Sequence, residues 1–419
     1  MSELSVTTEV ARRYLLGLQG LWPGRRWDGK EGAAQAIHAL GSVQMDPVMI
    51  VARSHDLVLW SRVEGYNPDF LDQLMYRDRR FFDYGGHLDI YPIEELPYWR
   101  LHMKGRLTDR RQTEFEAEHP GLLDQVREEV RAKGPLASRD LEGAVRVSSY
   151  RGSKDTRVAL YNLWLRGELM TNSRNRFERL YDLRERIAPP ELGHDVSEAD
   201  TMRHFRRTIL DKLGLGTLCA WTSSLASPLH RSVDRATAKR LMGEMAEQGE
   251  AISVAVEGQK DLYYTSAGGI DQLRQLSEGG VPAEWAPLGT SAEEEVDLLS
   301  PLDNLLERSR TKSLFGFEYI WEIYKPASAR RWGRYTMPIL WGDRLVGRLD
   351  PKMDRKSGTL IIQGLWLEDA ATSADPAFAS ALAVGLARFG RFHGARSINT
   401  EAVQHEALRL AIHSPPTHV

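Results

Sequence analysis

Gln44 and Asp46 flank one apolar residue, Met45, directly after a segment with helical hydrophobic spacing. In an extended backbone, residues i and i+2 project to the same side, so both polar side chains can face one pocket while Met45 packs behind them. A carboxylate beside an amide can hold and activate a water molecule without a metal or cofactor. The structural alternative is a helix end at which Gln44 and Asp46 only bond nearby backbone groups.

The composition is that of an ordinary globular protein. The 419 residues are 42% hydrophobic and 27% charged, and this length predicts two to four structural units. The single cysteine, Cys219, excludes disulfides within the chain and Cys-based metal clusters. No apolar run reaches the ~18 residues that a membrane span needs, and residues 1–7 lack a secretory signal pattern. We therefore expect a cytoplasmic protein that does not enter a membrane.

The charge is unevenly distributed, although the net charge is only −3. Residues 131–190 contain thirteen Lys or Arg against seven Asp or Glu, a local charge of +6. Residues 300–360 contain twelve against seven, a local charge of +5. Basic segments on a nearly neutral chain indicate a nucleic-acid footprint on one face. The alternative is a set of solvated helices with ordinary arginines.

No cofactor or metal is expected from the motifs. The histidines form no His-Glu-x-x-His pair, and no Gly-x-Gly-x-x-Gly pattern is present. Residues 24–30 match the start of a phosphate-binding loop, but Glu31 replaces the Ser or Thr that would bind magnesium.

Hydrophobic periodicity divides the chain into four parts. We expect an N-terminal helical unit over 1–130, with helices near residues 8–18 and 29–40. In the part at 131–192, a helix at 155–166 ends at Gly167 and a hairpin follows, which is the order of a winged helix. The part at 193–290 repeats that order. The strand-rich part at 291–419 predicts an antiparallel β-barrel with a terminal helix at 380–392. Its strands are expected at 318–324, 335–340, 344–350 and 359–366. The fold class is therefore α+β.

Six motifs, in order along most of the chain, resemble the AlkZ/YcaQ-type winged-helix DNA glycosylases of crosslink repair. They lie at residues 44–46, 51–62, 166–182, 299–303, 314–319 and 344–352. The resemblance implies three tandem winged-helix units and a C-terminal β-barrel, curved to hold duplex DNA. The family's catalytic signature is Gln, an apolar residue, and then Gln or Asp. Asp46 at the third position is similar to the YcaQ-type branch.

That branch implies broad repair of N7-alkylpurines, including the unhooking of interstrand crosslinks. An N7-alkylated guanine already carries positive charge, so it can leave without protonation. On this resemblance, Asp46 stabilises the oxocarbenium-like sugar and activates water, and Gln44 holds that water. Gly85 stands where the family pattern has an aromatic residue, so the role of the nearby His87 in a pocket stays open.

The expected partner is double-stranded DNA with alkylated or crosslinked purines, bound by a monomer. Arg53 is either a phosphate clamp or the partner of Asp56 or Glu64. The densest mixture of cations and aromatics is Arg330-Arg331-Trp332-Gly333-Arg334-Tyr335, which the sequence places in a loop or hairpin. Its alternative is a solvated loop with arginine stacked on Trp332. The full set of expected DNA contacts is Arg53, Arg174, Arg176, Arg308, Arg310, Arg330, Arg331, Arg334, Lys352 and Lys356.

Two other classes of protein compete with a glycosylase. A noncatalytic winged-helix regulator would read sequence through a recognition helix and would release no base. An enzyme acting on nucleosides or free sugars fits poorly with the basic segments. No lysine is placed as a Schiff-base nucleophile, so the glycosylase is expected to be monofunctional.

Overall fold

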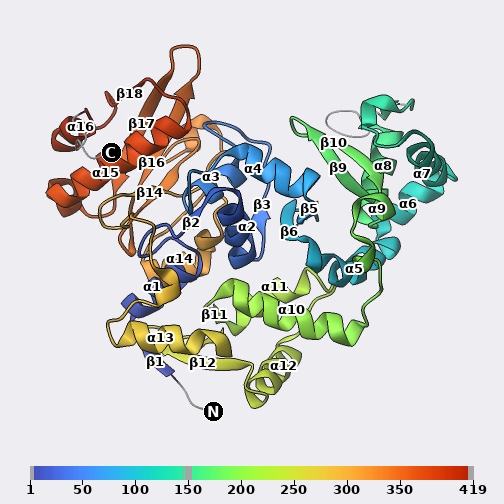
Figure 1. The fold of residues 1–419 in the computed structure, drawn as a ribbon, viewed down its shortest axis with the longest axis horizontal. Helices are drawn as coiled ribbons and strands as arrows, with labels where there is room; N and C mark the ends of the chain where they lie inside the picture. Colours follow the sequence, from blue (N-terminus) through green and yellow to red (C-terminus); the bar gives the residue numbers. More distant parts are fainter. Residues whose placement is uncertain (1–3, 144, 147–152, 414–419) are drawn as a thin grey trace. The chain divides into compact units, whose positions relative to one another are not determined.

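The computed structural model describes residues 4–143, 145–146 and 153–413 (Figure 1). The chain folds into two compact units, each a mixture of helices and strands. The first unit comprises residues up to 70, 210–218, and 242 onward. The second comprises residues 71–209 and 219–241.

The first unit contains most of the strands. Its helices are α1 (Thr8–Leu18), α2 (Gly29–Leu40), α3 (Ser54–Trp60), α13 (Ile270–Ser277), α14 (Arg308–Phe315), α15 (Pro376–Phe392) and α16 (Glu406–His413). Its strands are β1 (Leu4–Val6), β2 (Trp27–Asp28), β3 (Val43–Gln44), β4 (Val63–Glu64), β11 (Gly216–Thr217), β12 (Ala251–Val256), β13 (Tyr263–Ser266), β14 (Asp297–Leu298), β15 (Met337–Trp341), β16 (Arg344–Asp354), β17 (Thr359–Leu367) and β18 (Ser397–Asn399).

Helix α1 shows why the local sequence forms a helix in this unit. Thr7 caps it by accepting the N–H of Val10 through its side-chain oxygen at 3.2 Å. Helical spacing then buries Val10, Tyr14 and Leu15 in the main hydrophobic core, which also includes Phe317. The expected helices at 8–18 and 29–40 are therefore confirmed as α1 and α2.

The C-terminal strands form a five-stranded sheet in the order β14-β15-β16-β17-β18. Register shifts between Ile339 and Leu340 and between Asp350 and Pro351 mark bulges, which bend a sheet. Helix α15 packs on this sheet, where Phe378 meets Trp341 edge to face (Figure 1). Turns at Gly342-Asp343 and at residues 355–358 connect β15 to β16 and β16 to β17.

Two expectations for this sheet need correction. The segment Glu318–Tyr324 is irregular and not a strand, because its backbone is held by side chains: Arg348 Nη1 donates to the Glu318 carbonyl at 3.3 Å. The sheet is also mixed, since β17 and β18 pair in parallel while the other pairs are antiparallel.

The second unit is mainly helical. Its helices are α5 (Leu96–Gly105), α6 (Arg110–Glu118), α7 (Leu122–Lys133), α8 (Asp155–Leu165) and α9 (Arg184–Ile187). Its strands are β5 (Phe81–Tyr84), β6 (Asp89–Pro92), β7 (Val145–Arg146), β8 (Ser153–Lys154), β9 (Leu169–Asn175) and β10 (Glu178–Leu183). Helices α4 (Pro68–Asp72), α10 (Glu198–Leu213), α11 (Leu218–Ala226) and α12 (Arg235–Glu247) each have residues in both units.

The expected hairpin after Gly167 is confirmed. Strands β9 and β10 pair antiparallel, and Arg176 occupies the turn with a φ of 57°. Helix α8 precedes them and ends where Gly167 adopts a φ of 68°. This helix followed by a two-stranded hairpin is the local order of a winged helix; the four-part division of the chain stays a prediction.

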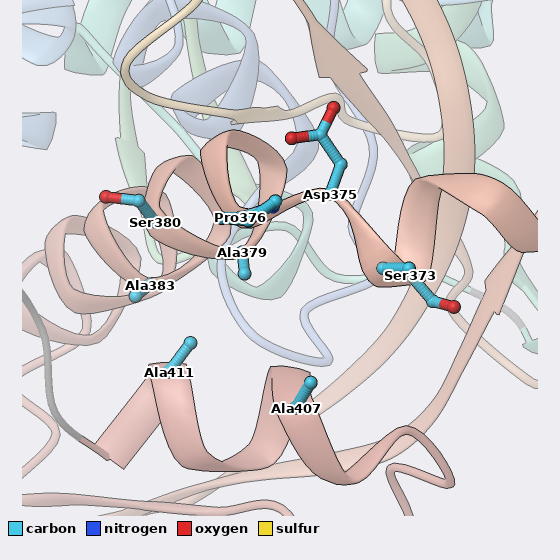
Figure 2. A pocket seen from close by; sticks show the side chains of 9 residues that line it. Ser373, Asp375, Pro376, Ala379, Ser380, Ala383, Ala407 and Ala411 are labelled. Atoms are coloured by element: carbon cyan, nitrogen blue, oxygen red, sulfur yellow. The ribbon is translucent and has the colours of Figure 1, made fainter.

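Helices α15 and α16 enclose a shallow pocket of about 350 Å³ (Figure 2). Figure 2 shows Ala379 and Ala383 of α15 facing Ala407 and Ala411 of α16. These small side chains leave space but supply no hydrogen-bonding group.

Among the residues that the structure describes, none of the helices combines the length and the apolar character that a membrane span requires.

A buried ion pair ties two distant segments of the first unit together. Arg62 Nη1 and Nη2 each lie 2.8 Å from an oxygen of Asp303, and both side chains are fully buried. Arg62 also donates to the carbonyls of Gln19 and Val58 at 2.9 Å. Every oxygen and nitrogen of the pair is thus placed to be satisfied, which is what burial of charge requires.

Removing one partner should therefore cost more than removing an exposed pair. Asp303→Asn leaves the Arg62 guanidinium buried without its counter-charge, and we expect a loss of about 3–5 kcal/mol in the free energy of unfolding. Urea unfolding followed by fluorescence measures the loss. Arg110→Ala, at a solvent-exposed pair with Glu114, is the control and should cost less than about 1 kcal/mol. Equal losses for the two variants would contradict the structural role of the buried pair.

Candidate active site and DNA-binding loop

The candidate catalytic residues follow helix α2. The helix ends at Gly41, whose φ of 69° places it in the left-handed region, and strand β3 begins two residues later. Met45 is buried, whereas Gln44 and Asp46 are half-buried. This alternation of burial is the pattern expected when residues i and i+2 share one side of an extended backbone.

Side chains from distant parts of the first unit fix this segment. Asn304 Nδ2 donates to the carbonyl of Ser42 at 2.8 Å, and Lys212 Nζ donates to the Ser42 hydroxyl. At the other end, Arg355 Nη2 donates to the carbonyl of Val51 at 2.7 Å. An irregular segment leaves backbone groups without ladder partners, and these donors satisfy two of its carbonyls.

Asp46 has one oxygen engaged and one available. Its Oδ1 accepts the N–H of Val48 at 2.7 Å, which is an Asx turn. Within the described residues, no hydrogen bond reaches Oδ2. Partial burial raises the pKa of the Asp46 carboxyl, and the Val48 N–H opposes that change. The turn orients the carboxylate, while Oδ2 can accept a hydrogen bond from a substrate or water.

Ser54, Ser300 and Tyr335 form a cluster of hydroxyl groups, and the charge of Asp46 acts on one of them. The Oγ atoms of Ser54 and Ser300 are 2.5 Å apart, and both side chains are buried. The pKa of the Tyr335 phenol is raised, mainly by burial and secondly by the negative charge of Asp46. The two serine hydroxyls lower that pKa, but neither makes a hydrogen bond of normal geometry with the phenol. All three residues lie in motifs that the sequence singles out, at 51–62, 299–303 and 330–335, but nothing in those motifs indicates that their hydroxyl groups come together.

Arg53 pairs with an acidic residue on the next turn of helix α3. Its Nε lies 2.5 Å from Asp56 Oδ2 and its Nη2 lies 3.2 Å from Asp56 Oδ1. Tyr66 donates its hydroxyl to Asp56 Oδ1 at 2.9 Å. Of the two carboxylate partners considered from the sequence, Asp56 rather than Glu64 holds this arginine.

The basic loop at 330–335 is held by a buried carboxylate at its first half. Glu322 Oε2 accepts the N–H groups of Arg331 and Trp332 at 2.9 and 2.8 Å, and Oε1 accepts from Lys325 Nζ at 2.8 Å. Although burial acts in the opposite direction, these three donors lower the pKa of Glu322 to about 2. The loop therefore keeps its acidic anchor throughout the physiological pH range.

A second carboxylate holds the other half of the loop. Asp350 accepts the N–H groups of Arg334 and Tyr335 at 3.1 and 2.9 Å. Gly333 between the two halves has a φ of 146°, and a Cβ there would lie 2.1 Å from Asp350 Oδ2. Strand β15 consequently begins at Met337 instead of the predicted Tyr335. The loop leads directly from Arg334, which is exposed, to Tyr335, which is buried near Asp46.

The expected DNA contacts separate by exposure. Most are exposed or half-buried, namely Arg53, Arg176, Arg308, Arg330, Arg331, Arg334, Lys352 and Lys356. The guanidinium of Arg331 lies 4.2 Å from the ring centre of Trp332, and Arg348 lies 4.3 Å from the same ring. The stacking considered as an alternative for this loop is therefore present. Of the three arginines of the loop, Arg334 is the one that is exposed and does not stack on Trp332.

Two of the expected DNA contacts need correction. The Arg310 side chain is buried and donates to the carbonyl of Leu213 at 3.1 Å and to that of Asn304. The Arg174 side chain is also buried and pairs with Asp83. Both cations hold the protein's own chain, which argues against contact with phosphate.

His87 belongs to the second unit. It lines a pocket there together with the aromatic residues Tyr91 and Trp99. His87, whose role the sequence left open, is therefore a wall residue of a cavity in the second unit.

A DNA glycosylase is the class of protein defined by comparison with known families. The family described as "DNA glycosylase AlkZ-like" matches residues 37–392, and the chain belongs to this family. The protein is accordingly a DNA glycosylase, an enzyme of DNA repair. Among solved structures, it is similar to the Streptomyces sahachiroi DNA glycosylase AlkZ at 16% sequence identity and a TM-score of 0.60. That match covers 96% of this chain and 100% of the other, and it supports the fold.

The acidic anchor of the basic loop gives a direct test. Glu322→Gln replaces one of the two carboxylate oxygens with an N–H₂ group. Either the two backbone N–H groups or Lys325 then lose their acceptor, and the negative charge is lost as well. We expect the affinity for duplex DNA to fall about threefold to tenfold, because roughly one charge-assisted hydrogen bond is lost from the loop's support. Fluorescence anisotropy with labelled DNA measures this change. Glu318→Gln, at an exposed acid of the same segment, is the matched control, and an equal effect there would refute the anchoring role.

Proposed function

We propose that this protein is a monofunctional glycosylase that excises N7-alkylated purines and unhooks interstrand crosslinks by water attack at the anomeric carbon. The observation that carries the proposal is the state of Asp46. Its Oδ1 is fixed by the Val48 N–H at 2.7 Å, and Gln44, two residues earlier, is half-buried like Asp46. An oriented carboxylate beside an amide is sufficient for a reaction whose leaving group needs no protonation.

In this mechanism the substrate supplies part of the driving force. An N7-alkylated purine is cationic and leaves with the electron pair of the glycosidic bond, so the sugar develops oxocarbenium character. The Asp46 carboxylate stabilises that positive charge and accepts a proton from the attacking water. Gln44 holds the water through its amide. The products are the free base and an abasic site.

Duplex DNA is the proposed partner, bound by a monomer. Arg334 and the other exposed cations of the 330–356 region belong to the same unit as Asp46. Phosphate contacts by such residues give affinity without sequence preference, which suits a search for lesions. A base tied to the opposite strand cannot enter a closed pocket, so an open catalytic surface rather than full base flipping is proposed for crosslinks.

The finer architecture and the location of the protein are also proposed. Tandem winged-helix units and a barrel-like C-terminal sheet are supported by helix α8 with its β9–β10 hairpin and by the bulged sheet from β14 to β18. Action on chromosomal DNA would place the protein in the cytoplasm at the nucleoid. A hydrolytic mechanism needs no metal or other cofactor.

Loss of the Asp46 carboxylate should abolish most of the activity. Asp46→Asn keeps the shape of the side chain but removes its charge and its capacity to accept a proton, so we expect the rate to fall on the order of 10²–10⁴-fold. Duplex DNA with one N7-methylguanine is incubated with each protein, and alkali then cleaves the abasic sites. A nitrogen-mustard crosslink is tested in parallel. Asp56→Asn, at the carboxylate that binds Arg53, controls for a general loss of charge near the site. Retained activity in Asp46→Asn would refute the assignment.

The phosphate contact proposed for Arg334 can be tested through the salt dependence of DNA binding. Counter-ion release makes the logarithm of the binding constant fall with the logarithm of salt, by about 0.9 per phosphate contact. Arg334→Ala should reduce the slope for undamaged duplex DNA by about one contact. Arg274→Ala, an exposed arginine on helix α13, is the control and should leave the slope unchanged. An unchanged slope for Arg334→Ala would remove this residue from the interface.

A further inference from the structure

The second unit contains a pocket that the glycosylase mechanism does not use. It has a volume of about 320 Å³ and lies between helix α5, the β5–β6 turn and residues 226–230. Its walls include the flat rings of Tyr91 and Trp99, whose centres are 4.6 Å apart. His102 also lines the pocket and is only 4% exposed. The size and the aromatic walls suit a flat ligand.

His102 supplies a hydrogen-bond acceptor of known identity. Its Nδ1 lies 2.7 Å from the carbonyl oxygen of Ser227. A carbonyl only accepts, so Nδ1 carries the proton. Burial lowers the pKa of His102 to about 4, and the neutral ring therefore presents an unprotonated Nε2. That nitrogen is buried and has no hydrogen-bond partner in the described part of the protein. A buried acceptor of this kind calls for a ligand N–H.

Trp99, which also lines the pocket, carries a hydrogen-bond donor. The indole Nε1 of Trp99 is buried without a partner among the described residues, and Trp99 is 6% exposed. An indole N–H only donates, so the complementary ligand atom must be an acceptor. The pocket thus combines flat aromatic walls with one acceptor and one donor.

The charged groups of the pocket neutralise one another. Arg106 Nη1 lies 2.9 Å from Asp109 Oδ2, and His230 Nε2 lies 2.7 Å from Asp109 Oδ1. Asp109 engages both side chains, and Asp89 adds a second carboxylate to the lining, so the pocket offers little positive charge to a phosphate. A neutral ligand fits this balance better than an anionic one.

We propose that this pocket binds a purine base. A purine is flat and neutral, carries N–H donors for His102 Nε2, and carries ring nitrogen or carbonyl acceptors for the Trp99 indole. Two sources share this chemistry: a free base in solution and an unpaired base of a DNA strand. The proposal uses residues of the second unit and neither Gln44 nor Asp46, and it holds whether or not those two residues are catalytic.

The probe is 2-aminopurine, whose fluorescence falls when it stacks on an aromatic ring. It is titrated with the full-length protein as the free base in one arm. In the other arm it is the single bulged nucleotide of a duplex, with total DNA binding followed by anisotropy. Saturable quenching of the free base assigns the pocket to free purines. Quenching only in the duplex arm assigns it to an unpaired base of DNA.

Two variants test the site in different ways. His102→Asn keeps an amide donor for Ser227 but removes the Nε2 acceptor, and it should weaken binding about tenfold. Gly86 lines the pocket, and a Cβ there meets nothing within 4 Å. Gly86→Leu should therefore fill the mouth without disturbing the packing and should abolish quenching. His204→Gln is the matched control, since His204 lies outside the pocket, stacks on Tyr98 and binds Glu95.

The melting temperature of each variant shows whether it is folded, and Gly86→Leu keeps the test informative should His102→Asn unfold. The proposal is overturned if the wild-type protein quenches neither form of 2-aminopurine. It is equally overturned if folded Gly86→Leu and the wild type quench alike. Because neither arm measures base excision, failure here is distinguishable from failure of the proposed glycosylase mechanism.

Discussion

The short segment between helices α2 and α3 depends on side chains that arrive from far along the chain. It must stay extended to point Gln44 and Asp46 the same way, and an extended segment without a full strand partner leaves carbonyls unsatisfied. Asn304 meets the Ser42 carbonyl, and Arg355 meets the Val51 carbonyl. With those donors in place, the Val48 N–H can orient Asp46. The geometry of the candidate active site is thus a property of the whole first unit.

The basic loop at 330–335 is also held by side chains from elsewhere in the chain, but here acidic side chains accept its backbone N–H groups. A loop with three arginines would repel itself and sample many conformations, but Glu322 and Asp350 accept four of its backbone N–H groups. The acids bind the backbone and leave the guanidinium groups outside. The loop then continues into Tyr335, which lies under the influence of Asp46. One continuous stretch of chain therefore links the exposed Arg334 to a residue on which the charge of Asp46 acts.

In the second unit, several arginine side chains pair with acidic side chains of the same unit. Arg174 pairs with Asp83, and Asp109 engages both Arg106 and His230. These pairs hold the unit together and leave little positive charge at the pocket around His102. A protein can therefore carry a locally basic sequence, as at residues 131–190, without presenting all of that charge to DNA. Counting charges along the chain overestimates a footprint when the cations have partners inside the fold.

The sequence alone determined the features that arise from local periodicity and capping: helices α1 and α2, the hairpin after Gly167, and the alternation around Met45. These need only neighbouring residues, so their signals are local. The sequence predicted a strand at Glu318–Tyr324, which is irregular, and a DNA contact for Arg310, whose side chain is buried against carbonyls of the chain itself. A strand requires a partner strand, and a cation's role depends on which acceptors lie nearby; both are chosen by segments far apart in sequence. The tertiary structure alone brought the hydroxyl groups of Ser54 and Ser300 together and placed Tyr335 within the electrostatic influence of Asp46, because only packing can join such distant segments.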